Sequence, residues 1–597
     1  MSIRSIINGI AFITVLLATA CKKEKADNVN PSSQDALKVS NSNIRLFNFT
    51  DYDVDMAINN IPLTAYGVKD GFGSVIAGTG NVTKLGLQYF PKEAWKAAAG
   101  GSPFILPTFL LDKNGNAQIR LTINQKTIDT TILNNTLQPK DYYLFRRVVG
   151  EKDAFNFVIL NREANPPAVA QNFKIRILNY QQNQDPLGLT GPVTLTFADG
   201  TPVSPLLSNI APNTASAYVE LPYGAYQFKL FGADGASIDV TKQLTELPVQ
   251  PDFQSQKPLP QPQEGIIVPV RTYKPGGAYT MLLSPAAMIY NDKYDDGAGD
   301  VQKIGVNMNV YRVVTDINPD VNFSFARVQA ANALPGAVVN VLIDGTPVGE
   351  QLDFGKNSGY SILTRGEHTV SITNAAGKKL AEKPLTLYPY DNYTVWATLQ
   401  ADGSAGILFS AVNMTATSFD NYGNNTGGDG SGLLRKQFYT WSTRFLNLSP
   451  DVPAATFTND NALLIDYDAY YHNLPAPATY NILSNKAPDI DPFLSYGIGK
   501  KTLGTANPAN IGQGSITTIR AYESTPGKYP ELPGRLLMNV TPVNVKDQFI
   551  ANKALYTSES LKPWAELGVY TVALIGRTGT GVPATEKARM IVIKHNK

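Results

Sequence analysis

Apolar and polar residues alternate along most of this chain in short runs, and turns rich in glycine, proline and asparagine separate the runs. "YGAYQFKLFGADG" from Tyr223 and "RGEHTVSITNAAG" from Arg365 are two examples, and each leads into a glycine turn. Alternation over about 4–8 residues predicts a half-buried β-strand. Many short strands with regular turns favour an all-β fold built from β-sandwiches.

Four segments open alike, with a short apolar strand that contains one arginine, then a turn, then an alternating strand. They begin at Ile44, Ile175, Phe325 and Thr443. An Arg-x-x-Asn motif marks three of these openings, at Arg45/Asn48, Arg176/Asn179 and Arg444/Asn447. The third opening has Arg327, but Ala330 stands where the asparagine would be.

Four segments also close alike, with a proline, then a tyrosine, then two apolar strands joined by a polar loop. The tyrosines are Tyr143, Tyr279, Tyr393 and Tyr570. In immunoglobulin-like sandwiches a tyrosine near the start of the penultimate strand hydrogen-bonds back to the chain and fixes a corner. We therefore expect these four tyrosines to be structural corner residues.

The spacing of the repeats decides the architecture. Their starts are too far apart for solenoid units of about 20–50 residues, so we predict four tandem immunoglobulin-like β-sandwiches. The glycine-rich run "NYGNNTGGDGSG" predicts a flexible linker before a mobile fourth domain. The predicted division is a signal peptide (1–20), a disordered tether (21–41), four sandwiches (42–165, 170–316, 320–416 and 438–597) and a flexible linker (417–437).

Two quoted segments resemble a known family. "LPGAVVNVLIDGTPV" from Leu334 and "SPDVPAATF" from Ser449 are similar to the domain of unknown function 4397. The resemblance is clear in the third and fourth copies, weaker in the second, and limited to "DYDVDMAINNIPL" in the first. It implies extracellular β-sandwich modules. It implies no known chemistry and transfers no active-site residue.

The start of the chain reads as an export signal. Residues 5–20 carry no charge, which is too short for a membrane-spanning helix of about 20 residues but fits a signal-peptide core of roughly 7–15. "ATAC", ending at Cys21, resembles the lipobox of bacterial lipoproteins, in which the cysteine is lipidated. The resemblance implies a lipid anchor at Cys21 in the cell outer membrane, facing the periplasm or the cell surface. An ordinary signal peptide followed by an incidental cysteine is the alternative.

Composition narrows the function classes. Cys21 is the sole cysteine of 597 residues, so with it lipidated no thiol is left for a disulfide, a zinc site or a nucleophile. The 51 basic and 49 acidic residues nearly balance, which argues against a nucleic-acid partner. We expect no enzymatic activity, because the three histidines are far apart in sequence and no Gly-x-Ser-x-Gly motif or phosphate loop is present. Paired carboxylates of a glycoside hydrolase are the alternative.

Two loops are candidate sites. The acidic loop "NDKYDDGAGD" could supply oxygen ligands to calcium, although a solvated loop is the simpler interpretation; its aspartates are Asp292, Asp295, Asp296 and Asp300. We otherwise expect no cofactor. "IDYDAYYHNL" groups aromatic and polar residues that suit ligand recognition, although a strand with buried tyrosines is the simpler interpretation; its residues are Tyr467, Tyr470, Tyr471 and His472.

Together these patterns predict a non-catalytic, lipid-anchored cell-envelope protein that displays immunoglobulin-like domains for binding or adhesion, with a glycan or a surface protein as its partner. A structural stalk or subunit of an outer-membrane surface complex is the first alternative. A secreted carbohydrate hydrolase is the second.

Overall fold

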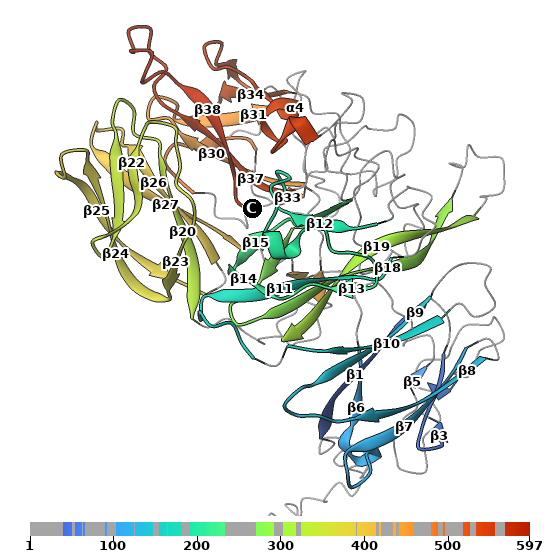
Figure 1. The fold of residues 1–597 in the computed structure, drawn as a ribbon. Coiled ribbons are helices and arrows are strands. Elements are labelled where there is room, and N and C mark those ends of the chain that lie inside the picture. Colours follow the sequence, from blue (N-terminus) through green and yellow to red (C-terminus); the bar gives the residue numbers. More distant parts are fainter. Residues whose placement is uncertain are drawn as a thin grey trace, which may run out of the picture. The chain divides into compact units, whose positions relative to one another are not determined.

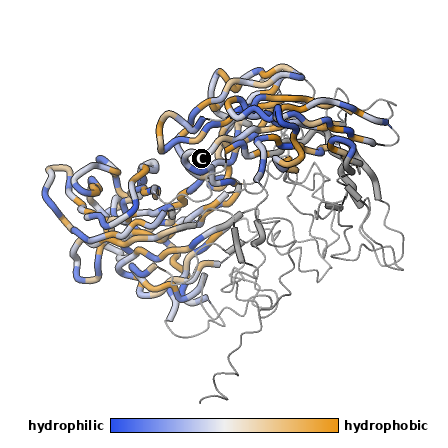
Figure 2. The backbone as a smooth tube through the Cα atoms, turned by 90° about the horizontal axis from the view of Figure 1, so that it is seen from below, coloured by the Kyte–Doolittle hydropathy of each residue, from blue (hydrophilic) through white to orange (hydrophobic). Residues whose placement is uncertain are grey.

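The computed structural model describes residues 40–50, 54–62, 64–65, 90–91, 103–123, 126–146, 155–163, 165–181, 191–232, 270–291, 303–317, 324–389, 391–413, 417–419, 434–436, 441–458, 479–487, 494–495, 518–525, 533–555 and 568–597. The structure is almost entirely β, with several sandwich-like pairs of sheets, so the all-β prediction is confirmed (Figure 1). Short hydrophobic and hydrophilic stretches alternate along the described chain (Figure 2).

The chain divides into two compact units, which we describe separately. The first unit comprises Met1–Asn48, Tyr52–Lys96 and Pro103–Tyr142, and the second comprises Phe49–Asp51, Ala97–Ser102 and Tyr143–Lys597. We refer to residues 42–165, 170–316, 320–416 and 438–597 as repeats 1 to 4. Repeats 2, 3 and 4 all lie within the second unit.

Repeat 1 contains two four-stranded sheets. One has the order β10-β9-β1-β6 and the other β3-β2-β7-β8. Short strands β4 and β5 pair with each other. The bounds are β1 (Asn41–Phe49), β2 (Asp55–Ile58), β3 (Ile61–Pro62), β4 (Thr64–Ala65), β5 (Phe90–Pro91), β6 (Phe104–Pro107), a 3₁₀ turn η2 (Thr108–Leu110), β7 (Asn116–Ile123), β8 (Lys126–Leu133), β9 (Lys140–Arg146) and β10 (Phe155–Asn161).

Repeat 2 contains one large sheet and two short strand pairs. The large sheet has the order β13-β11-β18-β19, with β14 also pairing to β11, and the short pairs are β12-β16 and β15-β17. The bounds are β11 (Asn172–Asn179), β12 (Val193–Thr196), η3 (Pro205–Leu207), β13 (Thr214–Ala215), β14 (Val219–Pro222), β15 (Gly224–Tyr226), β16 (Lys229–Gly232), β17 (Arg271–Tyr273), β18 (Ala278–Asn291) and β19 (Lys303–Ile317).

Repeat 3 consists of two four-stranded sheets, β23-β20-β26-β27 and β22-β21-β24-β25. Alternate residues of both sheets fill the core between them, including Val328, Val341, Ile372 and Val395, all fully buried. The bounds are β20 (Phe325–Asn332), β21 (Val339–Ile343), β22 (Thr346–Leu352), β23 (Ser361–Thr364), β24 (Gly366–Asn374), β25 (Lys379–Leu387), β26 (Asp391–Leu399) and β27 (Ala405–Asn413).

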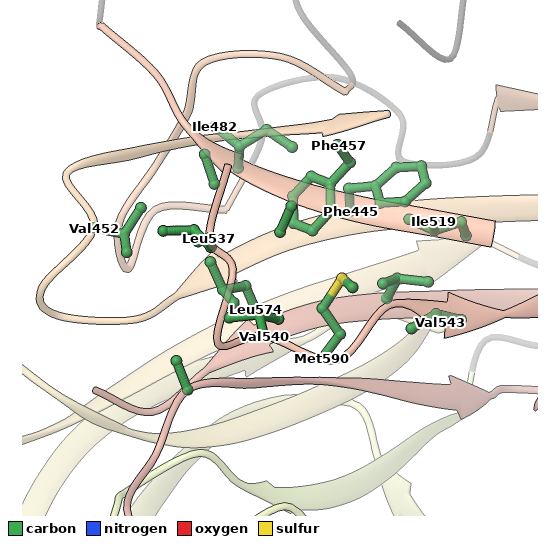
Figure 3. Close-up of a cluster of buried hydrophobic side chains, with 14 of the residues drawn as sticks. Phe445, Val452, Phe457, Ile482, Ile519, Leu537, Val540, Val543, Leu574 and Met590 are labelled. Atoms are coloured by element: carbon green, nitrogen blue, oxygen red, sulfur yellow. The ribbon is translucent and has the colours of Figure 1, made fainter. Parts of the chain in front are cut away.

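Repeat 4 follows the same plan, with sheets β33-β30-β37-β38 and β32-β31-β34-β35, and β36 also pairing to β34. Phe445, Phe457, Ile519 and Leu574 lie in its core (Figure 3). The bounds are β30 (Trp441–Leu448), β31 (Ala454–Thr458), β32 (Ile482–Leu483), β33 (Leu494–Ser495), β34 (Thr518–Glu523), β35 (Arg535–Leu536), β36 (Val543–Asn544), α4 (Val545–Gln548), η6 (Lys553–Leu555), β37 (Gly568–Ile575) and β38 (Arg589–Lys594).

One strand order recurs in all four repeats: an edge strand, the opening strand, the penultimate strand and the last strand. In repeats 2, 3 and 4 the opening strand lies parallel to the penultimate strand, in the pairs β11–β18, β20–β26 and β30–β37. This parallel contact departs from the antiparallel sheets of the immunoglobulin fold. The repeats are therefore sandwich-like with their own topology.

A buried asparagine is the last or the last but one residue of the opening strand in repeats 2, 3 and 4. Asn332 Nδ2 donates to the carbonyls of Ala337 (2.7 Å) and Leu352 (2.8 Å), and its Oδ1 accepts from the backbone N–H of Leu334 (2.9 Å). Asn447 Nδ2 likewise bonds the carbonyls of Val452 and Ile482. A single amide side chain thus joins the turn to a second strand where the chain leaves one sheet for the other.

The buried asparagines show that the Arg-x-x-Asn motif was aligned wrongly in the third opening. Asn179 bonds the carbonyls of Gly191 and Ile210, as Asn332 and Asn447 bond theirs. Position 330 is therefore not the counterpart of Asn179. The motif of repeat 3 is Gln329-x-x-Asn332, two residues later than the sequence pattern indicated, and Gln329 pairs with Thr394 as Arg176 pairs with Thr280.

The predicted linker 417–437 is described only at its two ends. β28 (Thr417–Phe419) and β29 (Leu434–Lys436) form an antiparallel pair there. The domain boundaries stay a prediction.

Replacing Asn332 by alanine tests the role of the buried amide. The change leaves two carbonyls and one N–H unpaired in the interior, and we expect the free energy of unfolding of repeat 3 to fall by about 2–4 kcal/mol. Asn357→Ala is the control, because Asn357 is exposed and bonds only the neighbouring Ser358 carbonyl. Urea denaturation of the chain from Lys22 onward measures the stability of both variants. Equal denaturation midpoints for the two variants would contradict the role assigned to Asn332.

Candidate functional site

The residues predicted to bind or anchor lie outside the described residues. They are Cys21, Asp292, Asp295, Asp296, Asp300, Tyr467, Tyr470, Tyr471 and His472. The acidic loop lies between β18 and β19, and the tyrosine-rich segment follows β31. Within the described part of the chain, no group of three His, Cys, Asp or Glu side chains could hold a metal ion. Calcium binding at the acidic loop stays a prediction.

The four closing tyrosines are described and all are buried. The hydroxyl of Tyr279 accepts a hydrogen bond from the backbone N–H of Lys274, and that of Tyr393 accepts one from Tyr388, both at 3.0 Å. Each bond reaches five residues back. Burial raises the pKa of Tyr279 to about 12, so its hydroxyl stays neutral. In repeat 4 the partner is a carbonyl, because the Tyr570 hydroxyl donates to the Phe549 carbonyl at 3.4 Å.

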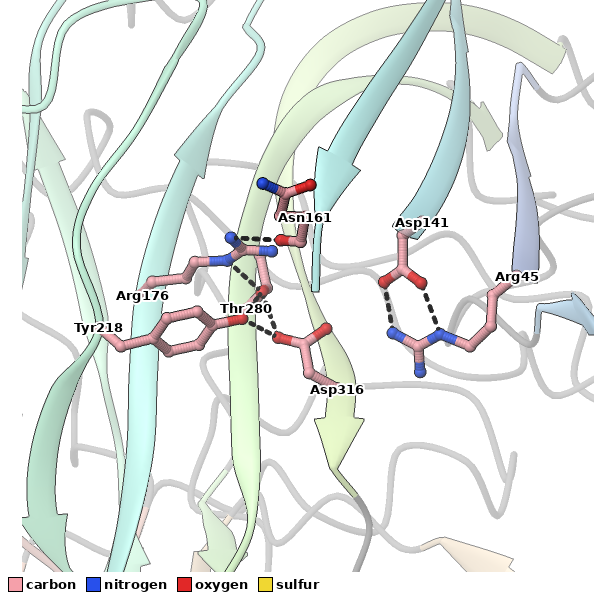
Figure 4. A network of polar contacts seen from close by, with 7 residues as sticks. All are labelled: Arg45, Asp141, Asn161, Arg176, Tyr218, Thr280 and Asp316. Carbon is pink, nitrogen blue, oxygen red and sulfur yellow. Dashed lines mark hydrogen bonds and ion pairs between the residues drawn. The ribbon is translucent and has the colours of Figure 1, made fainter. Parts of the chain in front are cut away.

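Repeat 2 contains a network of buried polar side chains on the outer face of its large sheet (Figure 4). Arg176 Nε donates to Thr280 Oγ1 (2.9 Å), and both Thr280 and Tyr218 donate to Asp316 Oδ2, at 2.5 and 2.6 Å. The Arg176 guanidinium also lies 4.6 Å from the centroid of the Tyr218 ring and donates to the Asn161 carbonyl. Burial, together with the charge of Asp316, raises the pKa of Tyr218.

In repeat 1 the corresponding arginine has a direct partner. Arg45 Nε donates to Asp141 Oδ1 at 2.8 Å, and Arg45 Nη2 bonds the second carboxylate oxygen (Figure 4). The Asp141 side chain is fully buried. A two-pronged pair of this kind is among the stronger hydrogen-bonded ion pairs.

Repeats 3 and 4 share a buried apolar layer. It contains Ala331, Phe354 and Trp396 from repeat 3 and Leu446, Ala573 and Ile593 from repeat 4. A Cβ at Gly355 would lie 2.7 Å from Nη2 of Arg589, so the two repeats approach closely there. The expected mobility of the fourth repeat does not agree with this contact, because separating the repeats would expose the layer to water.

A histidine lies at the polar side of this layer. His595 Nδ1 is 3.2 Å from Nε2 of Gln329 and 2.7 Å from the hydroxyl of Tyr360, and its Nε2 is 2.7 Å from Oγ1 of Thr571. An amide nitrogen can only donate, so Nδ1 must accept and the proton must be on Nε2. The contacts therefore require a neutral imidazole. We call Gln329, Tyr360, Thr571 and His595 the polar seam.

The electrostatics of the polar seam agree with its geometry. Burial, with added repulsion from Arg444 and Arg327, lowers the pKa of His595 to about 3. Burial raises the pKa of Tyr360 to about 12. Both groups are therefore uncharged near neutral pH.

The two described histidines have both ring nitrogens engaged. His368 Nδ1 bonds Asp344 Oδ2 at 2.6 Å and its Nε2 bonds the Thr364 carbonyl at 2.8 Å. The third histidine, His472, lies outside the described residues.

Comparison with known families gives one finding. A DUF4397 domain, a domain of unknown function, is found at residues 326–422, which cover most of repeat 3. Among curated proteins, none matches this chain. The family resemblance is thus established for the third copy, and for the other copies it stays a prediction.

The polar seam was not found from the sequence. The Tyr-Thr dipeptides at Tyr279, Tyr393 and Tyr570 were an available signal, because the threonines face the opening-strand arginine or glutamine. Thr394, for example, accepts from Gln329 at 2.9 Å. No local pattern indicated His595, since its partners are far away in sequence.

Lowering the pH should destabilise the polar seam and so lower the free energy of unfolding. A histidine whose pKa is lowered on folding contributes stability that is complete above its unfolded value of 6.5 and is lost as pH falls toward about 3. We expect one buried histidine to cost about 2 kcal/mol of unfolding free energy by pH 5. His595→Gln should flatten the stability profile of the soluble chain between pH 7 and 4, and an unchanged slope would contradict the assignment.

Proposed function

We propose that this protein is a non-catalytic component of the bacterial cell envelope, anchored by lipid at Cys21, that presents β-sandwich repeats for binding or adhesion. The lipobox-like "ATAC" at the end of an uncharged run supports the anchor. Among the described residues, no helix is long and apolar enough to cross a membrane. The ligand class that we propose is a glycan or a surface protein.

The observation that carries the proposal is the exposed sheet of repeat 3. The sheet that contains β20 and β26 is buried on one face by the core and on the other by repeat 4. The second sheet, β22-β21-β24-β25, buries one face only. Within the described part of the chain, its outer face therefore remains available to a partner.

That outer face carries rows of hydrogen-bonding side chains. The register places Thr373 between Asn340 and Lys379, and Glu367 beside Thr386. Hydroxyl, amide and charged groups at the spacing of neighbouring strands suit a polar ligand rather than an apolar one. We propose this face as a recognition surface.

A structural stalk is the second candidate. The contacts among repeats 2, 3 and 4 favour it, because a spacer needs fixed neighbours and no ligand. A binding experiment separates the two candidates.

The anchor is tested by Cys21→Ala. Lipidation requires the thiol, so we expect the variant to lose labelling by a palmitate analogue and to move from the membrane fraction to the soluble fraction. Cys21→Ser is a matched variant, since a hydroxyl does not replace the thiol. Labelling that survives in both variants would overturn the anchor.

The recognition surface is tested with the soluble chain from Lys22 onward on a glycan array and on intact cells. Ser371→Arg places a bulky cation on the outer face, and we expect binding to weaken by about tenfold or more. Thr201→Arg is the control on an exposed loop of repeat 2. Absence of binding to any glycan or cell by the parent would favour the stalk.

A further inference from the structure

The segment after β38 continues along its own repeat. The backbone N–H of His595 donates to the Val569 carbonyl (2.8 Å), and Asn596 Oδ1 accepts from the Val569 N–H (3.0 Å). His595 and Asn596 are both buried. These bonds fix the segment against β37 of repeat 4.

The same segment reaches repeat 3. His595 contacts Gln329 and Tyr360 through Nδ1, as described above. Gln329 and Tyr360 come from β20 and from the chain just before β23. One imidazole therefore joins side chains of two repeats.

Two residues further on, the segment reaches repeat 2. The Lys597 N–H donates to the Ala225 carbonyl (3.0 Å), and the Gln227 N–H donates to the Lys597 carbonyl (2.8 Å). One residue bonded to the positions on either side of Tyr226 has the pattern of a parallel β-bridge. The Lys597 ammonium also lies 4.4 Å from the centroid of the Phe197 ring.

Other contacts support the same arrangement. Tyr223 donates to the Phe325 carbonyl at 3.3 Å, which joins repeats 2 and 3. Asn552 donates to the Asp199 carbonyl at 3.0 Å, which joins repeats 4 and 2. The polar seam and the apolar layer around Trp396 join repeats 3 and 4. Each pair of these three repeats is thus in direct contact.

We infer that the segment His595–Lys597 holds repeats 2, 3 and 4 together as one rigid body. Three consecutive residues serve three repeats: His595 bonds repeat 3, Asn596 bonds repeat 4 and Lys597 bonds repeat 2. The Lys597 contact uses backbone atoms, so it depends on the position of the segment and not on the lysine side chain. A partner would meet a surface of fixed geometry composed of three repeats.

The distance between repeats 2 and 4 tests the inference. The sole cysteine is Cys21, so the soluble chain from Lys22 onward has none and accepts spin labels at Thr201→Cys and Ala554→Cys, both exposed positions. Double electron–electron resonance on the labelled chain should show one narrow distance population.

Variants at Lys597 isolate the backbone bond. Lys597→Pro removes the donor N–H and should broaden the distance distribution at least twofold, whereas Lys597→Ala keeps the N–H and should leave it narrow. A chain ending at Asn596 should behave like Lys597→Pro, and it removes no residue of β38. A narrow distribution in both the proline variant and the shortened chain, or a broad one in the parent, would overturn the inference.

Discussion

The buried asparagine near the end of the opening strand is the interaction on which repeats 2, 3 and 4 depend. There the chain leaves one sheet for the other, and the amide bonds carbonyls of the chain that follows, including Leu352 of β22 and Ile482 of β32. Asn179, Asn332 and Asn447 each donate to two carbonyls. Asn332 and Asn447 also accept a backbone N–H, from Leu334 and Ser449. A buried backbone group without a partner costs about as much as a lost hydrogen bond. One side chain meets that requirement at each turn.

The parallel pair of opening and penultimate strands keeps the same register relative to this asparagine in repeats 2, 3 and 4. The arginine or glutamine three residues before the asparagine lies opposite a threonine of the penultimate strand in all three repeats. This polar position faces away from the core. In repeat 4 the threonine bonds His595, and in repeat 2 Thr280 bonds Asp316. The outer face of this sheet is therefore suited to burial against a neighbour, which leaves the second sheet for solvent or a partner.

Much of this fold could be predicted from the sequence, since alternating runs and turn residues report local structure. The strands, the recurrence of opening and closing segments and the tyrosines with backward bonds all follow from patterns within about ten residues. The third opening was aligned wrongly because Arg327 resembles the arginine of the Arg-x-x-Asn motif. In the structure, Gln329 and Asn332 occupy the positions of that arginine and asparagine. The polar seam could not be predicted, because Gln329 and His595 are 266 positions apart and only packing of the repeats brings them together.

Hydrogen exchange measured amide by amide tests the role of the asparagine most directly. The Leu334 N–H donates to the buried side chain of Asn332, and the Ala376 N–H donates to the side chain of Asn374 in an exposed turn. Both amides therefore bond an asparagine side-chain oxygen, but only the first bond is buried. If the buried asparagine holds the sandwich together, Leu334 exchanges only when repeat 3 unfolds as a whole, with the denaturant dependence of global unfolding, while Ala376 exchanges by local opening. Exchange of Leu334 by local opening, at a rate like that of Ala376, would contradict the account.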